Sequence, residues 1–539
     1  MFVAALVCVT SPAPVEAAEG NPLQLVAENR ISERRLDLTF TTPALANPTT
    51  VRILLPEGFD PAAATRYPVL YLLHGGAADY TSWTTGGSAH LLTEDLPLIT
   101  VMPDAGRSAW YTDWYNNGLG GPPMWETYHI DQLIPWVDAN FPTIAARSGR
   151  AIAGLSSGGF GTMSYASRHP DLFGAAAAFS GAVDTNTPPV VAGKVIDALA
   201  LQDRGGPGAL FGLRETEEVR WRGHNPWDLA TNLRDTSVTL RTGNGEAGGE
   251  FGGGGPTDPG GFFLERACYD QSVSLHGRLD TLGIDHTWED YGPGTHNFNY
   301  WNNSLSKTLP TFMEVFAEGR PDPSTFSFRA VENEYGIYDW HVVFDRPVVE
   351  FSYFDDVSST GFVMSGSGDA SVLSAPDYEP GATYLVSMSG DFGEAEAVEQ
   401  VADDAGRLVL EVPLGPANLL QQRFTPTHES PGTTVYSTEV SIEATSPVAT
   451  TISVGAERDH QGALLTAQLL EVDGAGLAGK EIVFMVDGRE VGRGVANADG
   501  ATGVLLERAP KPRSVITARF VGDATFSAAE ASTTWGPGS

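Results

Sequence analysis

The stretch Arg150-Ala-Ile-Ala-Gly-Leu-Ser-Ser-Gly-Gly159 decides the fold that this sequence predicts. It begins as a short apolar strand, and residues 154–158 match the pattern G-x-S-x-G. A helix is expected to start near Gly159 and to end before Pro170. A strand that turns sharply into a helix through these glycines raises the hydroxyl of Ser156 above a sheet edge. The pattern predicts a serine nucleophile, and an ordinary glycine-rich turn is the alternative.

Around this motif, residues 51–296 alternate short apolar runs with longer amphipathic stretches. The runs at 69–73, 98–102, 151–153 and 238–240 are nearly continuous, as in strands that helices cover on both faces. Helices are expected over 125–140 and 159–169. This alternation predicts an α/β architecture, with a mostly parallel sheet between helices.

The sequence pattern changes after residues 319–323. Closely spaced strands with Gly, Asp and Pro turns follow, and they predict two all-β sandwiches separated by a Pro/Ser/Thr-rich linker at 425–447. The expected organisation is a signal peptide at 1–18, an α/β domain at 19–320, a β-sandwich at 321–430 and a second sandwich at 446–539.

Composition excludes several classes of function. The 539 residues carry 67 Asp and Glu against 32 Lys and Arg, a formal charge of −35 that repels nucleic acid and anionic lipid. After the first residues, no stretch reaches the roughly 20 apolar residues of a membrane span. We therefore expect neither a nucleic-acid partner nor a membrane span.

The first residues predict export. Residues 2–9 form a short apolar run, and residues 15–17 have the small-x-small form of a cleavage site. The basic residues that usually precede such a run are missing, so a buried strand is the alternative. Export implies a secreted or cell-surface protein. Cys8 would be removed with the signal, and Cys268 alone leaves no internal disulfide.

A serine nucleophile needs a base, and in such a sheet the base follows the last strand. His296 ends the loop Gly-Pro-Gly-Thr-His at 292–296 and precedes a helix-like stretch at 301–316. The oxyanion needs two N–H donors. The amides of Gly76, after the strand at 69–73, and of Ser157 have the expected positions.

The spacing of residues does not identify the acid that orients the base. It should lie between the strand at 238–242 and His296. The glycine-rich loop at 243–251 offers Glu246 and Glu250, and Asp258 and Glu265 lie further on.

Several strings in the right order resemble the esterase D and antigen 85 branch of α/β-hydrolases, over residues 51–316. They are Tyr-Thr-Asp-Trp-Tyr at 111–115, Trp-Glu-Thr-Tyr at 125–128 and Gly-Thr-His-Asn-Phe-Asn-Tyr-Trp at 294–301. In this family the acid follows a Gly-Asn-Gly turn and precedes an apolar residue and two glycines. The resemblance implies Glu250 as the acid, with Glu246 second.

The resemblance implies an esterase that hydrolyses small-molecule or polymer carboxylic esters through an acyl-enzyme. No cofactor or metal is expected, because the chain has no H-E-x-x-H, cysteine cluster or P-loop. Acyl transfer to a sugar or lipid alcohol is an alternative. The mycolyltransferases of this branch, however, carry an Arg after the oxyanion glycine and a Trp two residues after the histidine, where this chain has Ala77 and Phe298.

A non-catalytic adhesin or carbohydrate-binding protein is the alternative from another class. The last region resembles bacterial immunoglobulin-like repeats in its strings at 477–484, 497–500 and 520–523. Such modules act as spacers or adhesion units. We expect spacers, with contact to a polysaccharide or cell surface as the second interpretation.

Overall fold

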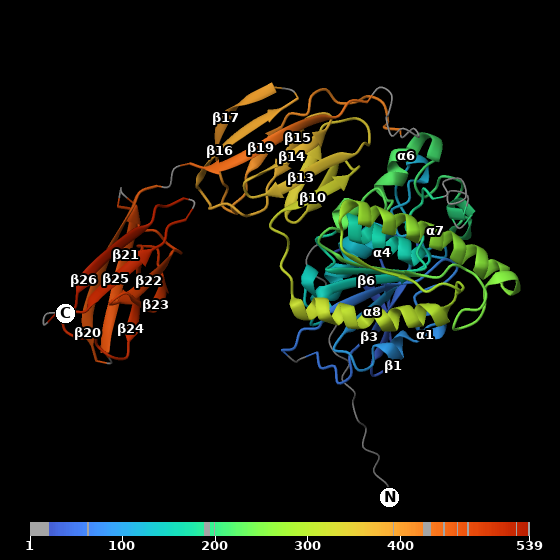
Figure 1. Ribbon diagram of the computed structural model, residues 1–539, viewed down its shortest axis with the longest axis horizontal. Coiled ribbons are helices and arrows are strands. Elements are labelled where there is room, and N and C mark those ends of the chain that lie inside the picture. Colours follow the sequence, from blue (N-terminus) through green and yellow to red (C-terminus); the bar gives the residue numbers. More distant parts are fainter. Residues whose placement is uncertain are drawn as a thin grey trace, which may run out of the picture.

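A computed structural model describes residues 21–536, apart from 62–63, 188–194, 199, 392, 424–432, 446–447, 461, 472–473 and 524. The predicted signal peptide at 1–18 lies outside these residues. The described chain forms an α/β part followed by two β parts (Figure 1).

The α/β part is built on one nine-stranded sheet, in the order β1-β2-β3-β5-β4-β6-β7-β8-β9. The strands from β5 to β9 in that order are parallel, and β1, β2 and β3 extend the sheet in antiparallel fashion. Their bounds are β1 Gln24–Ser32, β2 Arg35–Thr41, β3 Thr49–Leu54, β4 Val69–Leu73, β5 Ile99–Pro103, β6 Arg150–Leu155, β7 Ala175–Phe179, β8 Ser237–Thr242 and β9 His286–Asp290.

Helices cover both faces of this sheet, with α4 and α7 on one side and α1 and α8 on the other (Figure 1). The central strands are buried along their whole length, and their side chains belong to two hydrophobic cores, one on each face of the sheet. Ile152 packs into one core, and its neighbours Ala151 and Ala153 pack into the other. The helices are α1 Ser82–Thr85, α2 Ala89–Leu92, α3 Ile134–Asn140, α4 Ser157–Arg168, α6 Arg214–Gly223, α7 Pro259–Leu282 and α8 Phe298–Glu318.

The predicted α/β-hydrolase architecture is confirmed. The expected helix at 125–140 is a π-helical segment, Thr127–Leu133, that continues into α3.

The rest of the described chain consists of antiparallel sheets, as the two-sandwich prediction requires. A six-stranded sheet, β10-β13-β14-β19-β16-β17, and a four-stranded sheet, β11-β12-β15-β18, share one core and form the middle sandwich. Its strands are β10 Phe326–Ala330, β11 Glu334–Ile337, β12 Trp340–Phe344, β13 Ser352–Ser358, β14 Gly361–Gly366, β15 Ala370–Leu373, β16 Thr383–Gly390, β17 Gly393–Val401, β18 Val409–Val412 and β19 Tyr436–Ala444.

A three-stranded sheet, β20-β21-β24, and a four-stranded sheet, β23-β22-β25-β26, form the last sandwich around another core. Its immunoglobulin-like character stays a prediction. The strands are β20 Thr450–Asp459, β21 Gly462–Glu471, β22 Glu481–Val486, β23 Arg489–Val495, β24 Ala501–Leu506, β25 Val515–Phe520 and β26 Ala529–Thr534.

The region expected as a linker at 425–447 differs in the structure. Its residues 436–444 form β19, which pairs with β14 and β16 inside the middle sandwich. Thr438, Val440 and Ile442 alternate toward the core, so burial of these side chains outweighs the polar composition of the stretch. The middle sandwich therefore extends beyond the expected boundary at residue 430.

The middle sandwich is packed directly on the α/β part. Val331 and Phe351 are buried against Val219 and Leu229 in one apolar cluster. The side chain of Asn232 donates to the carbonyl oxygen of Arg329 and accepts from its N–H. These contacts tie the two parts together.

Among the described residues, no helix combines the length and the apolar character that a membrane crossing requires.

Candidate active site

Ser156 occupies the sharp turn between β6 and α4. Its backbone has φ 57° and ψ −124°, a conformation that L residues rarely adopt and that holds the side chain away from both elements. A Cβ on Gly154 would collide with the carbonyl oxygen of Gly158, so the turn needs the glycines of the G-x-S-x-G pattern. The half-buried hydroxyl of Ser156 therefore stands at the carboxyl edge of the sheet.

The loop after β4 lies against this turn. A Cβ on Gly75 would lie 3.1 Å from the Cβ of Ser156, and a Cβ on Gly158 would collide with the carbonyl oxygen of His74. The imidazole of His74 holds the loop in place, because Nδ1 donates to the carbonyl oxygen of Gly75 at 2.8 Å and Nε2 accepts from Ala105 N at 3.0 Å.

The N–H groups of Gly76 and Ser157 both lack an acceptor within the part of the chain that the structure describes. Ser157 is the first residue of α4, where backbone N–H groups have no partner inside the helix. The positive end of the helix dipole also favours negative charge there. These two amides fit the role of donors to an oxyanion formed at Ser156.

The imidazole of His296 is paired with the carboxylate of Glu265. Nδ1 of His296 donates to Oε2 of Glu265 at 2.8 Å, and the side chain of Glu265 is fully buried. The other oxygen, Oε1, accepts from Ser180 Oγ and from Gly243 N, each at 2.8 Å, and from Tyr291 OH at 3.2 Å. The carboxylate is therefore saturated with donors.

Burial alone would raise the pKa of Glu265. The hydrogen bond and charge of His296, with the donors Gly243 and Ser180, outweigh burial and hold the pKa below its usual value. Glu265 is therefore ionised at neutral pH and accepts the Nδ1 proton. Nε2 of His296 is then left with a lone pair, and this buried atom has no partner among the described residues.

Hydrogen bonds place this pair at the same sheet edge as Ser156. The carbonyl of Phe179, the last residue of β7, accepts from Ser156 N at 3.1 Å. The next residue, Ser180, donates to Glu265 and accepts from Trp301 Nε1 at 3.2 Å. The indole ring of Trp301 in turn meets the imidazole of His296 edge-on, with ring centroids 4.9 Å apart.

Neither Glu246 nor Glu250, the two acids taken from the family resemblance, is the partner of His296. Both are exposed in the glycine-rich loop after β8. Glu265, an alternative that spacing left open, holds that position. The sequence carries a signal for it, since Asp258 followed by Pro259 is a typical helix start. The second turn of α7 then brings Glu265 to the sheet edge.

Asp258, another of the open candidates, has a different place. It caps α7 by accepting from Gly261 N at 3.1 Å and accepts from the hydroxyl of Thr295 at 2.7 Å. Because Thr295 precedes His296, this bond fixes the histidine loop to the start of α7.

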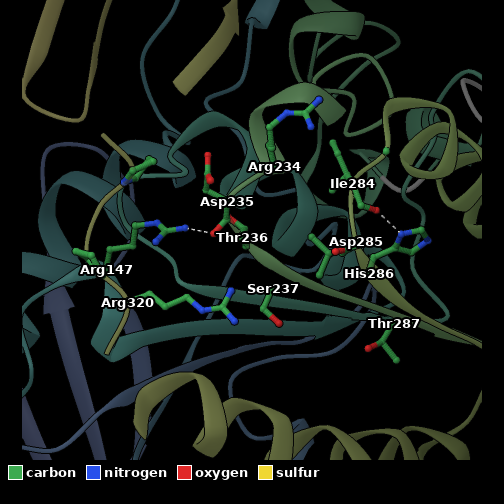
Figure 2. Close-up of a pocket in the computed structure, with 14 residues that line it drawn as sticks. Arg147, Arg234, Asp235, Thr236, Ser237, Ile284, Asp285, His286, Thr287 and Arg320 are labelled. Atoms are coloured by element: carbon green, nitrogen blue, oxygen red, sulfur yellow. Dashed lines mark hydrogen bonds between the residues drawn. The ribbon is translucent and has the colours of Figure 1, made fainter. Parts of the chain in front are cut away.

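A cavity of about 570 Å³ lies at the opposite edge of the sheet, at the amino ends of β8 and β9 (Figure 2). Its walls include Arg147, Ser237 and His286, and none of the residues around Ser156. It is therefore separate from the site described above.

The chain is similar to several known proteins. Esterase Rv1288 of Mycobacterium tuberculosis is 32% identical over 289 residues, which are 52% of this chain and 59% of that protein. The diacylglycerol acyltransferase/mycolyltransferase Ag85A of the same organism is 29% identical over 252 residues, 45% of this chain and 72% of that protein. The solved structure of M. tuberculosis MPT51 is 22% identical, with a TM-score of 0.43, over 54% of this chain and 100% of that one.

This chain therefore spans about three-fifths of the length of the esterase that it matches. The family described as "Putative esterase" matches residues 42–312, which include β4, β6, Ser156, Glu265 and His296. Since this match covers half of the chain, the protein belongs to the putative esterase family.

Proposed function

We propose that this protein is an exported serine esterase that hydrolyses carboxylic esters through an acyl-enzyme. The observation that carries the proposal is the buried pair of His296 and Glu265, whose free Nε2 atom lies at the sheet edge that presents Ser156. The family match and the name of the esterase relative support it.

In the proposed reaction, the hydroxyl of Ser156 attacks the ester carbonyl while Nε2 of His296 takes its proton. Glu265 holds the Nδ1 proton and stabilises the imidazolium that forms. The amides of Gly76 and Ser157 donate to the oxyanion. The imidazolium then protonates the departing alcohol, and water, activated by His296, hydrolyses the acyl-enzyme.

Transfer of the acyl group to an alcohol is the second candidate, because one relative is named an acyltransferase. Ala77 follows the oxyanion glycine, and Phe298 packs edge-on against Trp83 with ring centroids 5.7 Å apart. Neither side chain offers a hydrogen bond to a sugar acceptor, so we favour hydrolysis. Product analysis with and without added trehalose or glycerol separates the two: hydrolysis gives free acid in both cases.

Two neighbouring serines give a matched test of the nucleophile. Ser156→Ala should lower kcat for a short-chain nitrophenyl ester by about 10⁵- to 10⁶-fold. Ser157→Ala keeps the backbone amide that the mechanism uses and removes a hydroxyl without a partner among the described side chains, so it should stay within a few-fold of the parent. Equal activity of both variants would refute the assignment.

A fluorophosphonate probe distinguishes an enzyme from a surface adhesin with an inactive α/β part. The esterase should be labelled stoichiometrically, whereas well-folded protein that resists labelling would favour the adhesin. For the two sandwiches we propose a spacer role, with polysaccharide or cell-surface contact as the alternative. Export is tested by expressing the full chain in a secreting host and sequencing the amino terminus of the protein in the medium.

A further inference from the structure

Three side chains of the kinds that bind metals gather where α7 turns into β9. They are His276, Asp280 and His286, and one nitrogen or oxygen atom of each lies within 4.8 Å of the others. Glu265 belongs to the start of α7, whereas this group lies near the end of the helix. The group takes no part in the proposed ester chemistry.

The end of α7 brings the three residues together. His276 and Asp280 are four residues apart and share one face of the helix. Gly283, in the left-handed conformation at φ 62°, ends the helix, and Ile284 N donates back to Leu279 O at 3.0 Å. This cap reverses the chain, so that His286, the first residue of β9, lies beside the helix.

Both imidazole rings are held in a fixed orientation. Nδ1 of His286 donates to the carbonyl oxygen of Ile284 at 2.8 Å, at one side of the cavity in Figure 2. Nε2 of His286 therefore carries a lone pair, and it faces Nδ1 of His276 at 2.7 Å. His276 stacks on Trp288 with ring centroids 4.7 Å apart and planes 5° apart. A hydrogen bond from the outer nitrogen to a backbone carbonyl is the usual support of a metal-binding histidine.

Asp280 completes the group from the solvent side. One of its oxygens lies within 4.8 Å of a ring nitrogen of each histidine, and its side chain is 62% exposed, so it has room to turn toward a bound ion. An incoming ion therefore has access from water and keeps room for a water ligand. Zn–N bonds of 2.0–2.1 Å in tetrahedral geometry separate ligand atoms by about 3.3 Å. The two ring nitrogens need to open by a few tenths of an ångström.

We propose that His276, Asp280 and His286 form a binding site for Zn²⁺ or a similar divalent transition metal, which clips α7 to the edge strand β9. Two imidazoles and one carboxylate, with water in the fourth position, form a ligand set that suits zinc. Ca²⁺ and Mg²⁺ prefer sets made of oxygen atoms. The metal replaces the hydrogen bond between His276 Nδ1 and His286 Nε2. The proton of His276 moves from Nδ1 to Nε2, so that Nδ1 carries the lone pair that binds the metal.

The clip joins the two elements that carry the His296–Glu265 pair. Glu265 belongs to α7, and β9 leads through Tyr291 into the loop of His296. Metal binding should therefore stabilise the folded state, whether or not the protein is an esterase. This site is independent of the proposed function.

The test uses the full chain, stripped with a chelator and titrated with ZnCl₂, with bound metal measured by mass spectrometry and Tm by calorimetry. The parent should bind one equivalent of Zn²⁺ that Ca²⁺ does not replace. At 100-fold excess over Kd, Tm should rise by about 3–6 °C. His276→Gln keeps a planar side chain on Trp288. This variant should not bind the equivalent of Zn²⁺, and zinc should not raise its Tm.

Asp280→Asn changes an exposed side chain near the end of α7 and should weaken zinc binding by about tenfold or more. His341→Ala is the matched control, because His341 also pairs with a carboxylate, Glu334, at 3.1 Å but has no second histidine beside it among the described residues. It should bind zinc like the parent. Equal zinc affinity in the parent, His276→Gln and Asp280→Asn, or equal stabilisation by Ca²⁺, would overturn the proposal.

Discussion

Replacement of Glu265 by glutamine tests the acid that the structure selects. The amide is nearly isosteric with the carboxylate, but one of its ends donates hydrogen bonds. The carbonyl oxygen must take the place of Oε1, because Gly243 N can only donate to it. The NH₂ group then faces Nδ1 of His296 and forces that atom to accept.

The proton of the imidazole consequently moves to Nε2, the atom that must receive the proton of Ser156. The corresponding change of aspartate to asparagine in another Ser-His-acid triad lowers kcat about 10⁴-fold through the wrong tautomer. For Glu265→Gln we expect a loss of about 10³- to 10⁴-fold, which corresponds to about 4–5.5 kcal/mol of transition-state stabilisation. The groups that donate to Oε1 keep their acceptor, so the fold should persist.

The assay is kcat/KM for a nitrophenyl ester at pH 8, with Tm as the control for folding. Glu246→Gln and Glu250→Gln are matched controls, since both side chains are exposed in the loop after β8. They should stay within about twofold of the parent. A large loss in Glu250→Gln together with full activity in Glu265→Gln would refute the reasoning.

Three further results are expected. Gly154→Ala should lower the free energy of unfolding by about 3 kcal/mol in urea, because its Cβ meets the backbone of Gly158, whereas Gly277→Ala, with open space in α7, should not destabilise the protein. Burial lowers the pKa values of His129 and His224 from the usual 6.5 to about 4. Between pH 4 and 6.5 the unfolded chain therefore binds more protons than the folded protein does. Stability present above pH 6.5 should therefore fall as the pH drops toward 4, by up to about 1.4 kcal/mol per pH unit for each histidine, and His129→Gln should remove one such slope from urea unfolding curves. A chain that ends at Gly319 should lose about 3 kcal/mol relative to one that ends at Thr445, because Arg168 loses its ion pair with Glu332 and the cluster around Val331 is opened; equal unfolding midpoints would contradict this.

The sheet and the serine turn could be predicted from sequence because local patterns determine them. β4, β6 and β8 are apolar runs, and the glycines at 154 and 158 are required by contacts within the turn itself. The loop that carries His296 precedes a long helix, as the sequence indicates. The antiparallel strands β1, β2 and β3 were not distinguished. They pair with one another along neighbouring sequence, but they join the parallel strands through the pairing of β3 with β5, a distant contact that the local pattern does not reveal.

The carboxylate that pairs with His296 was not the one that the resemblance implies, because its position depends on tertiary packing. Glu246 and Glu250 follow the strand closely, as the family pattern suggests, but they lie in solvent. Glu265 comes 23 residues after the end of β8 and reaches the site only because α7 folds back along the sheet. Strand β19 was not predicted, for a related reason. Its polar outward residues resemble a linker, and only the pairing with β14 and β16 buries the alternate side chains.

The most direct measurement is a crystal structure of the protein after reaction with a fluorophosphonate. It should show phosphorus bonded to Oγ of Ser156, its phosphoryl oxygen within hydrogen-bond distance of the amides of Gly76 and Ser157, and Nε2 of His296 turned toward the adduct with Nδ1 still on Glu265. A covalent adduct on another residue, or an imidazole of His296 that does not reach the adduct, would contradict the proposed site.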